Sequence, residues 1–209
     1  KSRQKVNQMN KPKIVVMASG EGSLLQALLD QQKNLNYEVG MVLSDKKEAR
    51  ALARAQAASV PTQLLEQKNF ESIDAWHFAI LRTIQAANPA LIVLAGFMRI
   101  LPELIVLEFQ NKILNSHPSL LPLFPGLNAV AQALAENVQE TGATVHLVDQ
   151  GVDTGPIVHQ VTVKVLPQDT PEALHQRIKL AEQEALPKVV DLLVNNQWQV
   201  VGGKVVIDY

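Results

Sequence analysis

Short aliphatic runs alternate with longer amphipathic stretches through the first half of the chain, and this rhythm constrains the fold most. The runs are KIVVMA (13–18), EVGMVLS (38–44), VPTQLL (60–65), LIVLAG (91–96) and KILNS (112–116), with helices predicted over 24–32, 47–58, 70–87 and 103–109. Continuous Val, Ile and Leu residues without polar alternation are typical of strands covered on both faces. We therefore expect a doubly wound, mostly parallel α/β sheet whose ligands bind beyond the carboxyl ends of its strands.

The pattern changes after Gly126. A short helix over 129–136 is followed by ATVHLV (143–148) and PIVHQVTVKV (156–165), whose alternation is typical of antiparallel strands. A long helix is expected from about 171 to 194, and WQVVGGKVVIDY is compatible with a terminal hairpin. Residues 1–12 are polar and basic and are expected to form a flexible tail. Residues 13–209 are predicted to form one domain with antiparallel additions in its C-terminal half.

Composition argues against several classes of protein. The 209 residues include 19 Lys and Arg and 20 Asp and Glu, giving a net charge of -1, whereas proteins that coat nucleic acids carry a basic excess. The absence of cysteine excludes disulfides, thiolate zinc sites and cysteine nucleophiles. The longest apolar run, 90–98, is too short to cross a bilayer, and no secretory leader opens the chain. We expect a soluble, cytoplasmic protein without nucleic-acid or membrane partners.

The stretch MASGEGSLLQALL leads from the first predicted strand into the first helix. Gly20 and Gly22 allow backbone amides to approach a ligand closely, and Ser23 is placed to cap the helix. Free N–H groups at a helix start form an anion site, although an ordinary tight turn explains two glycines equally well. A dinucleotide fingerprint needs a third glycine where Leu25 stands, and Asp45 is only a partial match for a ribose-binding acid. A monophosphate is therefore favoured over a dinucleotide.

The stretch ILNSHPSLLPLFPG (113–126) contains a histidine in a stiff setting. His117 follows the fifth predicted strand, and Pro118 restricts its backbone. Asn115 lies two residues earlier, so on an extended chain both side chains leave the same face. An amide beside an imidazole can stabilise an oxyanion, although a histidine hydrogen-bonded at a strand end fits the spacing slightly better. Asp153, in DQGVDTGPIV, could orient this histidine or accept a proton, although aspartate is also common in turns.

Together these segments resemble the folate-dependent formyltransferases, and among them the phosphoribosylglycinamide formyltransferases of purine biosynthesis. The resemblance rests on ASGEGSLLQALL, LAGFMRIL, ILNSHPSLLPLFPG, TGATVHLVDQGVDTGPIV and RIKLAEQEALP, and extends from about residue 13 to 198. HPSLLP with VDTGP downstream is shared by the whole group, while the glycine loop favours the member that acts on glycinamide ribonucleotide. The resemblance implies a Rossmann-like fold and formyl transfer from the co-substrate 10-formyltetrahydrofolate to the amine of this ribonucleotide.

The resemblance also implies roles for particular residues. Asn115, His117 and Asp153 match the catalytic trio, in which the first two donate to a tetrahedral oxyanion and Asp153 favours the imidazolium form of the histidine. The ribonucleotide is expected to contact Gly20, Gly22, Ser23, Leu24, Pro118, Lys179 and Glu182. The folate is expected to contact Met98, Arg99, Ile100, Leu101, Val148, Asp149, Gln150 and Gly151. No metal is expected, and His146 is predicted to be structural or to line a pocket, with the structural role favoured.

The sequence departs from the family pattern at several positions. Leu24 stands where an asparagine that donates to the phosphate is common, and Ile73 where a basic residue can meet the glutamate tail of folate. Asn128 and Val130 replace histidines common in the loop after PGL. Two alternatives stay open: an enzyme with another formyl acceptor, such as a nucleotide-linked amino sugar, or a catalytically silent nucleotide-binding module. A homodimer is an open alternative to a monomer.

Overall fold

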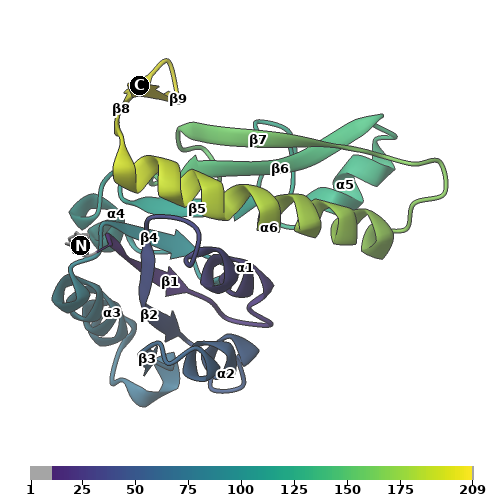
Figure 1. The fold of residues 1–209 in the computed structure, drawn as a ribbon. Coiled ribbons are helices and arrows are strands. Elements are labelled where there is room, and N and C mark those ends of the chain that lie inside the picture. Colours follow the sequence, from purple (N-terminus) through teal and green to yellow (C-terminus); the bar gives the residue numbers. More distant parts are fainter. Residues whose placement is uncertain (1–10, 209) are drawn as a thin grey trace, which may run out of the picture.

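The computed structural model describes residues 11–208, which build one nine-stranded sheet (Figure 1). Its strands are β1 (Lys13–Met17), β2 (Glu38–Ser44), β3 (Thr62–Leu64), β4 (Leu91–Leu94), β5 (Ile113–His117), β6 (Glu140–Leu147), β7 (Ile157–Lys164), β8 (Gln197–Val201) and β9 (Lys204–Asp208). They are ordered β3-β2-β1-β4-β5-β6-β7-β9-β8. The first five are parallel, and β6 is antiparallel to β5 and β7. The predicted α/β sheet with antiparallel additions is confirmed.

Helices cover both faces of this sheet (Figure 1). They are α1 (Ser23–Gln31), α2 (Arg50–Ala57), α3 (Ile73–Ala87), α4 (Glu103–Glu108), α5 (Ala129–Ala135) and α6 (Pro171–Asn195), with a single 3-10 turn, η1 (Gln67–Asn69). In β1, Ile14 and Val16 pack with α1 and α6, whereas Val15 and Met17 pack with α3 on the opposite face. Because both faces of the central strands are buried, their sequences are continuously aliphatic.

Helix boundaries differ by a few residues from the predicted ones, and the caps explain why. The helix predicted from residue 70 begins at Ile73, because Ser72 accepts a hydrogen bond from the Ala75 N–H and caps it. The long helix predicted over 171–194 is α6, which is capped by Thr170 and begins with Pro171. Figure 1 shows α6 lying along the same face of the sheet as α1. This position brings the middle of α6 over the end of β5.

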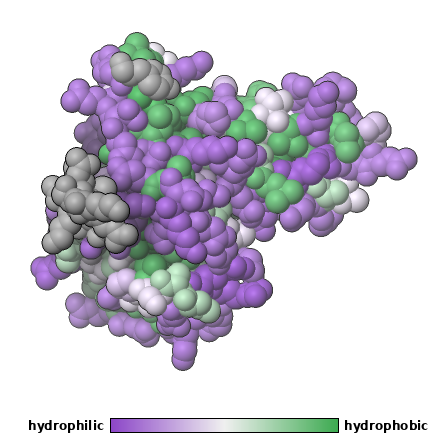
Figure 2. All heavy atoms as spheres, in the orientation of Figure 1, coloured by the Kyte–Doolittle hydropathy of each residue, from purple (hydrophilic) through white to green (hydrophobic). Residues whose placement is uncertain are grey.

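The C-terminal strands β8 and β9 form the predicted antiparallel hairpin, with Gly202 and Gly203 at its turn. The hairpin joins β7 through one bridge, Ile157 to Lys204, and projects from the end of the sheet (Figure 1). The face that carries α1 and α6 is mostly hydrophilic, with hydrophobic residues in separate areas (Figure 2). The predicted flexible tail lies outside the described residues except for residues 11 and 12. Within residues 11–208, no helix combines the length and apolar character that a membrane span requires.

The strand order reverses between β1 and β4, because β2 and β3 lie beyond β1 while β5 lies beyond β4. Ligands of doubly wound sheets bind outside the carboxyl ends of the strands at such a point. β1, β4 and β5 end at Met17, Leu94 and His117, and the loops that follow these strands meet at this edge. The candidate site is therefore found where the topology predicts it.

Candidate active site

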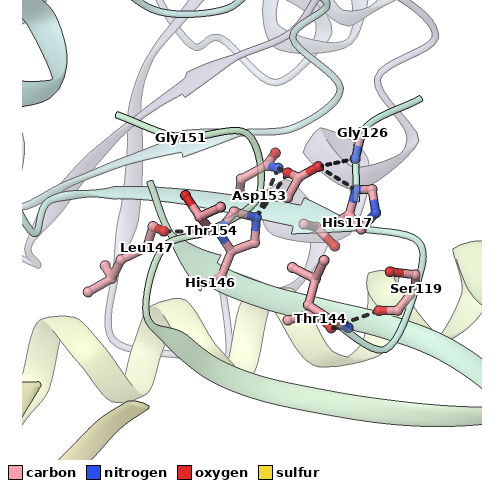
Figure 3. A network of polar contacts seen from close by, with 12 residues as sticks. His117, Ser119, Gly126, Thr144, His146, Leu147, Gly151, Asp153 and Thr154 are labelled. Carbon is pink, nitrogen blue, oxygen red and sulfur yellow. Dashed lines mark hydrogen bonds and ion pairs between the residues drawn. The ribbon is translucent and has the colours of Figure 1, made fainter. Parts of the chain in front are cut away.

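The three residues of the predicted catalytic trio lie together at the end of β5. Figure 3 shows His117 and Asp153 of this trio facing each other. His117 Nδ1 is 3.2 Å from Asp153 Oδ2, and Asn115 Nδ2 donates to Asp153 Oδ1 at 3.4 Å. Ser116, between them in sequence, points to the other face and donates to Glu182 on α6. The alternation of side chains along a strand thus aims Asn115 and His117 at one carboxylate, as the spacing predicted.

Asp153 is held in this position by its own backbone conformation and by the neighbouring loop. Its φ of 54° lies in the left-handed region, and its Oδ2 accepts the Gly126 N–H at 2.8 Å. Burial raises the pKa of Asp153, but hydrogen bonds from His146 and Gly126 and the charge of His117 outweigh burial, so this pKa lies below its usual value. The carboxylate is therefore an anion that can orient and charge-balance an imidazole.

Both ring nitrogens of His117 face oxygen acceptors. Nδ1 faces Asp153, and Nε2 lies 2.7 Å from the Phe124 carbonyl oxygen, which can only accept a hydrogen bond. The His117 side chain is buried, so the ring is fixed from both sides. The predicted donation from His117 to a substrate oxyanion would use Nε2, and it requires the Phe124 carbonyl to give up this hydrogen bond.

His146 belongs to the same cluster, although the sequence favoured a purely structural role for it (Figure 3). Its Nε2 lies 3.2 Å from Asn115 Nδ2 and 3.4 Å from Asp153 Oδ1, and its Nδ1 donates to the Leu147 carbonyl. The pairing of β5 with β6 places His146 directly opposite Asn115. That register was not visible in the alternation of TVHLV, and it is the signal that would have identified this residue.

A cavity of roughly 280 Å³ opens on one side of the end of β5. It is lined by all seven residues predicted to contact the ribonucleotide: Gly20, Gly22, Ser23, Leu24, Pro118, Lys179 and Glu182. Met98, predicted to contact folate, lines this cavity rather than the second one, and His175, which the sequence did not single out, joins it from α6. We refer to this space as the phosphate-side cavity.

The glycine loop at this cavity differs from the prediction in its cap. Gly22, with a φ of 73°, is the N-cap of α1, and Ser23 is the first residue of the helix. Ser23 therefore does not cap α1 as predicted, and within the described part of the chain no side chain caps it. The first N–H groups of a helix have no partner within the helix, so they can donate to an anion in the phosphate-side cavity.

Glu182 is a buried carboxylate at the wall of the phosphate-side cavity, 5% exposed. Ser116 Oγ donates to its Oε1 at 2.6 Å. Burial raises the pKa of Glu182, and the Ser116 hydrogen bond and the charge of Lys179 oppose this rise only in part. Lys179 lines the same cavity one turn earlier, so the two residues face the site together, as their spacing on α6 predicted.

A second cavity, of roughly 130 Å³, lies beside the catalytic trio. It is lined by seven of the eight residues predicted to contact folate: Arg99, Ile100, Leu101, Val148, Asp149, Gln150 and Gly151. Asn115, His146 and Asp153 form its inner wall. We refer to this space as the folate-side cavity. Asn115 and Asp153 of the trio therefore border it directly, while Ser116 and Pro118, the two neighbours of His117, border the phosphate-side cavity.

Asp45, only a partial match to a ribose-binding acid, lines neither cavity. Its buried carboxylate accepts hydrogen bonds from Ser19 Oγ at 2.6 Å and Arg99 Nε at 2.9 Å. Ser19 Oγ also accepts the Met98 N–H at 2.9 Å. Asp45 therefore holds the segment after β4 against the segment after β1. Within residues 11–208, no three His, Asp or Glu side chains are grouped to hold a metal ion.

Comparison with known proteins shows the family of this chain. The sequence matches the formyl transferase family over residues 12–190. A phosphoribosylglycinamide formyltransferase of Mycobacterium tuberculosis is 47% identical over 191 residues, which cover 91% of this chain and 88% of that protein. The crystal structure of glycinamide ribonucleotide transformylase 1 from Symbiobacterium toebii has a TM-score of 0.91 and 39% identity, covering 96% of this chain and 95% of that one.

A longer relative matches only in part. The trifunctional purine biosynthetic protein adenosine-3 of Drosophila melanogaster is 41% identical over 196 residues, which are 92% of this chain but 14% of that protein. This chain therefore spans a small fraction of that relative, and the rest of the relative gives no information about this chain. The family match and the relatives of similar length are sufficient, and this chain belongs to the formyl transferase family.

Proposed function

We propose that this protein is a phosphoribosylglycinamide formyltransferase, which transfers a formyl group from 10-formyltetrahydrofolate to the primary amine of glycinamide ribonucleotide. The observation that carries the proposal is the position of Asn115, His117 and Asp153 at the end of β5, where the phosphate-side and folate-side cavities approach each other. A two-substrate transfer needs both partners at one set of catalytic groups. Both partners are small molecules.

The phosphate-side cavity suits the ribonucleotide. The uncapped N–H groups of α1 and the helix dipole attract a phosphate, and Lys179 adds a positive charge at the same cavity. Glu182 can accept hydrogen bonds from ribose hydroxyls. Burial raises the pKa of Glu182 and therefore opposes its ionisation, so an ionised Glu182 does not favour folding. A role in binding the ribose explains why a carboxylate occupies this position.

The reaction then follows from the groups at the trio. The amine attacks the formyl carbon, a C–N bond forms, and the carbonyl oxygen becomes an oxyanion to which Asn115 and His117 donate. Asp153 accepts the proton that the amine loses, directly or through water. Collapse of the intermediate breaks the bond between the formyl carbon and N10 of the folate, and N10 takes up a proton. The products are the formylated ribonucleotide and tetrahydrofolate.

The ultraviolet absorbance of the folate during turnover tests this proposal. Turnover is expected with glycinamide ribonucleotide and not without an acceptor, nor with a nucleotide-linked amino sugar in its place. Turnover without an acceptor would indicate a hydrolase, and preference for the amino sugar would indicate a different transferase. Binding of both substrates without turnover would leave the silent nucleotide-binding module as the explanation.

A further inference from the structure

Helix α2 holds the glycine loop of the phosphate-side cavity at two successive carbonyl groups. The Ala51 N–H donates to the Gly20 carbonyl at 3.1 Å, and Arg54 Nε donates to the Glu21 carbonyl at 2.8 Å. Gly22 also packs closely on α2, since a Cβ built there would lie 2.7 Å from the Ala51 Cα. The loop therefore takes its shape from α2, although α2 itself does not line the cavity.

The direction of these carbonyls determines the direction of the amides. In a planar trans peptide the C=O and N–H bonds point in opposite directions. With the Gly20 and Glu21 carbonyls turned toward α2, the N–H groups of Glu21 and Gly22 point away from α2. Both residues line the phosphate-side cavity. Successive amides that point the same way form a concave anion site, and here they continue into the free N–H groups of α1.

Arg54 also controls a negative charge at this site. Its NH2 lies 2.8 Å from Glu21 Oε1, and its NH1 donates to Gln26 Oε1 on α1 at 3.1 Å. The Glu21 pKa is lowered chiefly by the hydrogen bond from Arg54, so Glu21 is an anion beside the expected phosphate. Arg50 forms an ion pair with the same carboxylate at 2.9 Å, but its side chain is 72% exposed, against 27% for Arg54.

We propose that Arg54 is a positioning residue for the substrate phosphate. It does not contact the phosphate; it fixes the Glu21–Gly22 peptide with its N–H toward the phosphate-side cavity and holds the Glu21 carboxylate against α2. The inference deepens the proposed function, because it takes the ligand of this loop to be the phosphate of the ribonucleotide. It does not depend on which group receives the formyl.

Arg50 provides a matched control for the test. Arg54→Met and Arg50→Met each remove one positive charge and one ion pair with Glu21. Of these two arginines, only Arg54 donates to the Glu21 carbonyl in the described contacts. Arg54→Met is expected to raise the KM for glycinamide ribonucleotide about tenfold or more, with kcat and the KM for folate unchanged. Arg50→Met is expected to change this KM by less than about threefold. Equal effects of the two substitutions would overturn the positioning role in favour of simple charge attraction.

The phosphate-free analogue, glycinamide riboside, separates positioning from general damage. Wild type and Arg54→Met are expected to use the riboside with the same kcat/KM, because it has no phosphate to lose. An equal fall for riboside and ribonucleotide would overturn the proposal. In a Glu21→Gln background, Arg54→Met is expected to keep its effect on the ribonucleotide KM; loss of the effect would mean that Arg54 only neutralises Glu21.

Two further measurements apply if Arg54→Met does not fold or if the wild-type protein shows no formyl transfer. If Arg54→Met does not fold, Arg54→Lys keeps the charge but cannot hold the carbonyl, the carboxylate and Gln26 at once, and the same rise in KM is expected. If the wild-type protein does not formylate the ribonucleotide, calorimetry with inorganic phosphate still decides: weaker binding to Arg54→Lys than to Arg50→Met supports the inference, and equal binding overturns it.

Discussion

His117 is fixed by groups from three separate parts of the chain: its own strand, the Phe124 carbonyl and the Asp153 carboxylate. We expect His117→Ala to lower kcat at least about a hundredfold, because it removes the proposed donor to the oxyanion. Steady-state kinetics on protein whose circular dichroism matches wild type will measure this. Turnover near that of wild type in a folded variant would exclude His117 from the mechanism.

Glu182 offers a test of stability against pH at the residue scale. Because burial raises its pKa in the folded protein above the reference value of 4.5, protonated Glu182 favours folding, and this contribution is lost as pH rises through the folded-state pKa. We expect Glu182→Gln to unfold at higher urea concentration than wild type at pH 8, with the difference disappearing below about pH 4.5. The same variant should raise the KM for the ribonucleotide more than that for folate. A difference in stability between Glu182→Gln and wild type that does not change with pH would contradict the raised pKa of Glu182.

Leu24 stands where the resemblance to phosphoribosylglycinamide formyltransferases leads us to expect an asparagine donor to the phosphate. It lines that cavity at the second position of α1. A hydrogen bond to a charged group contributes about 1.5–3 kcal/mol, so we expect Leu24→Asn to tighten ribonucleotide binding about tenfold and to leave folate affinity unchanged. Isothermal titration with each ligand measures both. No gain for the ribonucleotide would indicate that backbone amides and Lys179 already satisfy the phosphate.

At the scale of elements, the glycine loop packs against α2 as a unit. The two glycines of this loop, Gly20 and Gly22, differ in how much room each has for a side chain. Gly22 combines a φ of 73° with close packing on Ala51, whereas a Cβ at Gly20 would meet no described atom within 4 Å. We expect Gly22→Ala to lower the free energy of unfolding by about 1–3 kcal/mol and Gly20→Ala by less than about 1 kcal/mol. Chemical denaturation of both variants measures this difference. Equal losses would show that the packing of α2 on Gly22 is not limiting.

Substitution of Gly22 is consequently a poor probe of ligand binding, because it would distort the loop whether or not a phosphate binds there. Gly20→Ala adds a methyl group at the cavity wall without a predicted clash. A selective fall in ribonucleotide affinity in this variant would place the phosphate against the loop; unchanged affinity would place it elsewhere.

Elements were largely predictable because their signals are local. Continuous aliphatic runs identified the parallel strands, and the Pro and Thr at the start of α6 marked its beginning. What the sequence could not supply was long-range. Asp45 turns toward Arg99, 54 residues away, and His146 enters the site because β6 pairs with β5 in one particular register. The cap of α1 was missed because Gly22 adopts positive φ and takes the N-cap position, so the helix starts at Ser23, one residue before the expected position.

At the scale of the whole molecule, the two largest hydrophobic cores of the described residues lie on opposite faces of one sheet. Trp76 belongs to the core on the α3 face, whereas Trp198 packs against the core on the α1 and α6 face. Because β1, β4 and β5 contribute residues to both cores, we expect the two cores to unfold together in one transition. Urea unfolding followed by fluorescence in Trp76→Phe and Trp198→Phe should show, for each variant, one transition that coincides with its circular dichroism. An earlier transition at Trp198 would mean that the β8–β9 hairpin opens separately, since one bridge joins it to β7.

Side chains along β5 point alternately to the two faces of the sheet, so the site depends on which residues of the strand are odd-numbered and which are even-numbered. Odd-numbered Asn115 and His117 contact the Asp153 carboxylate, and even-numbered Ser116 donates to the Glu182 carboxylate at the phosphate-side cavity. Losing or gaining a single residue within β5 would exchange these two sets between the faces of the sheet. Two such changes on the same strand would restore the arrangement, whereas one would turn these side chains to the wrong face of the sheet.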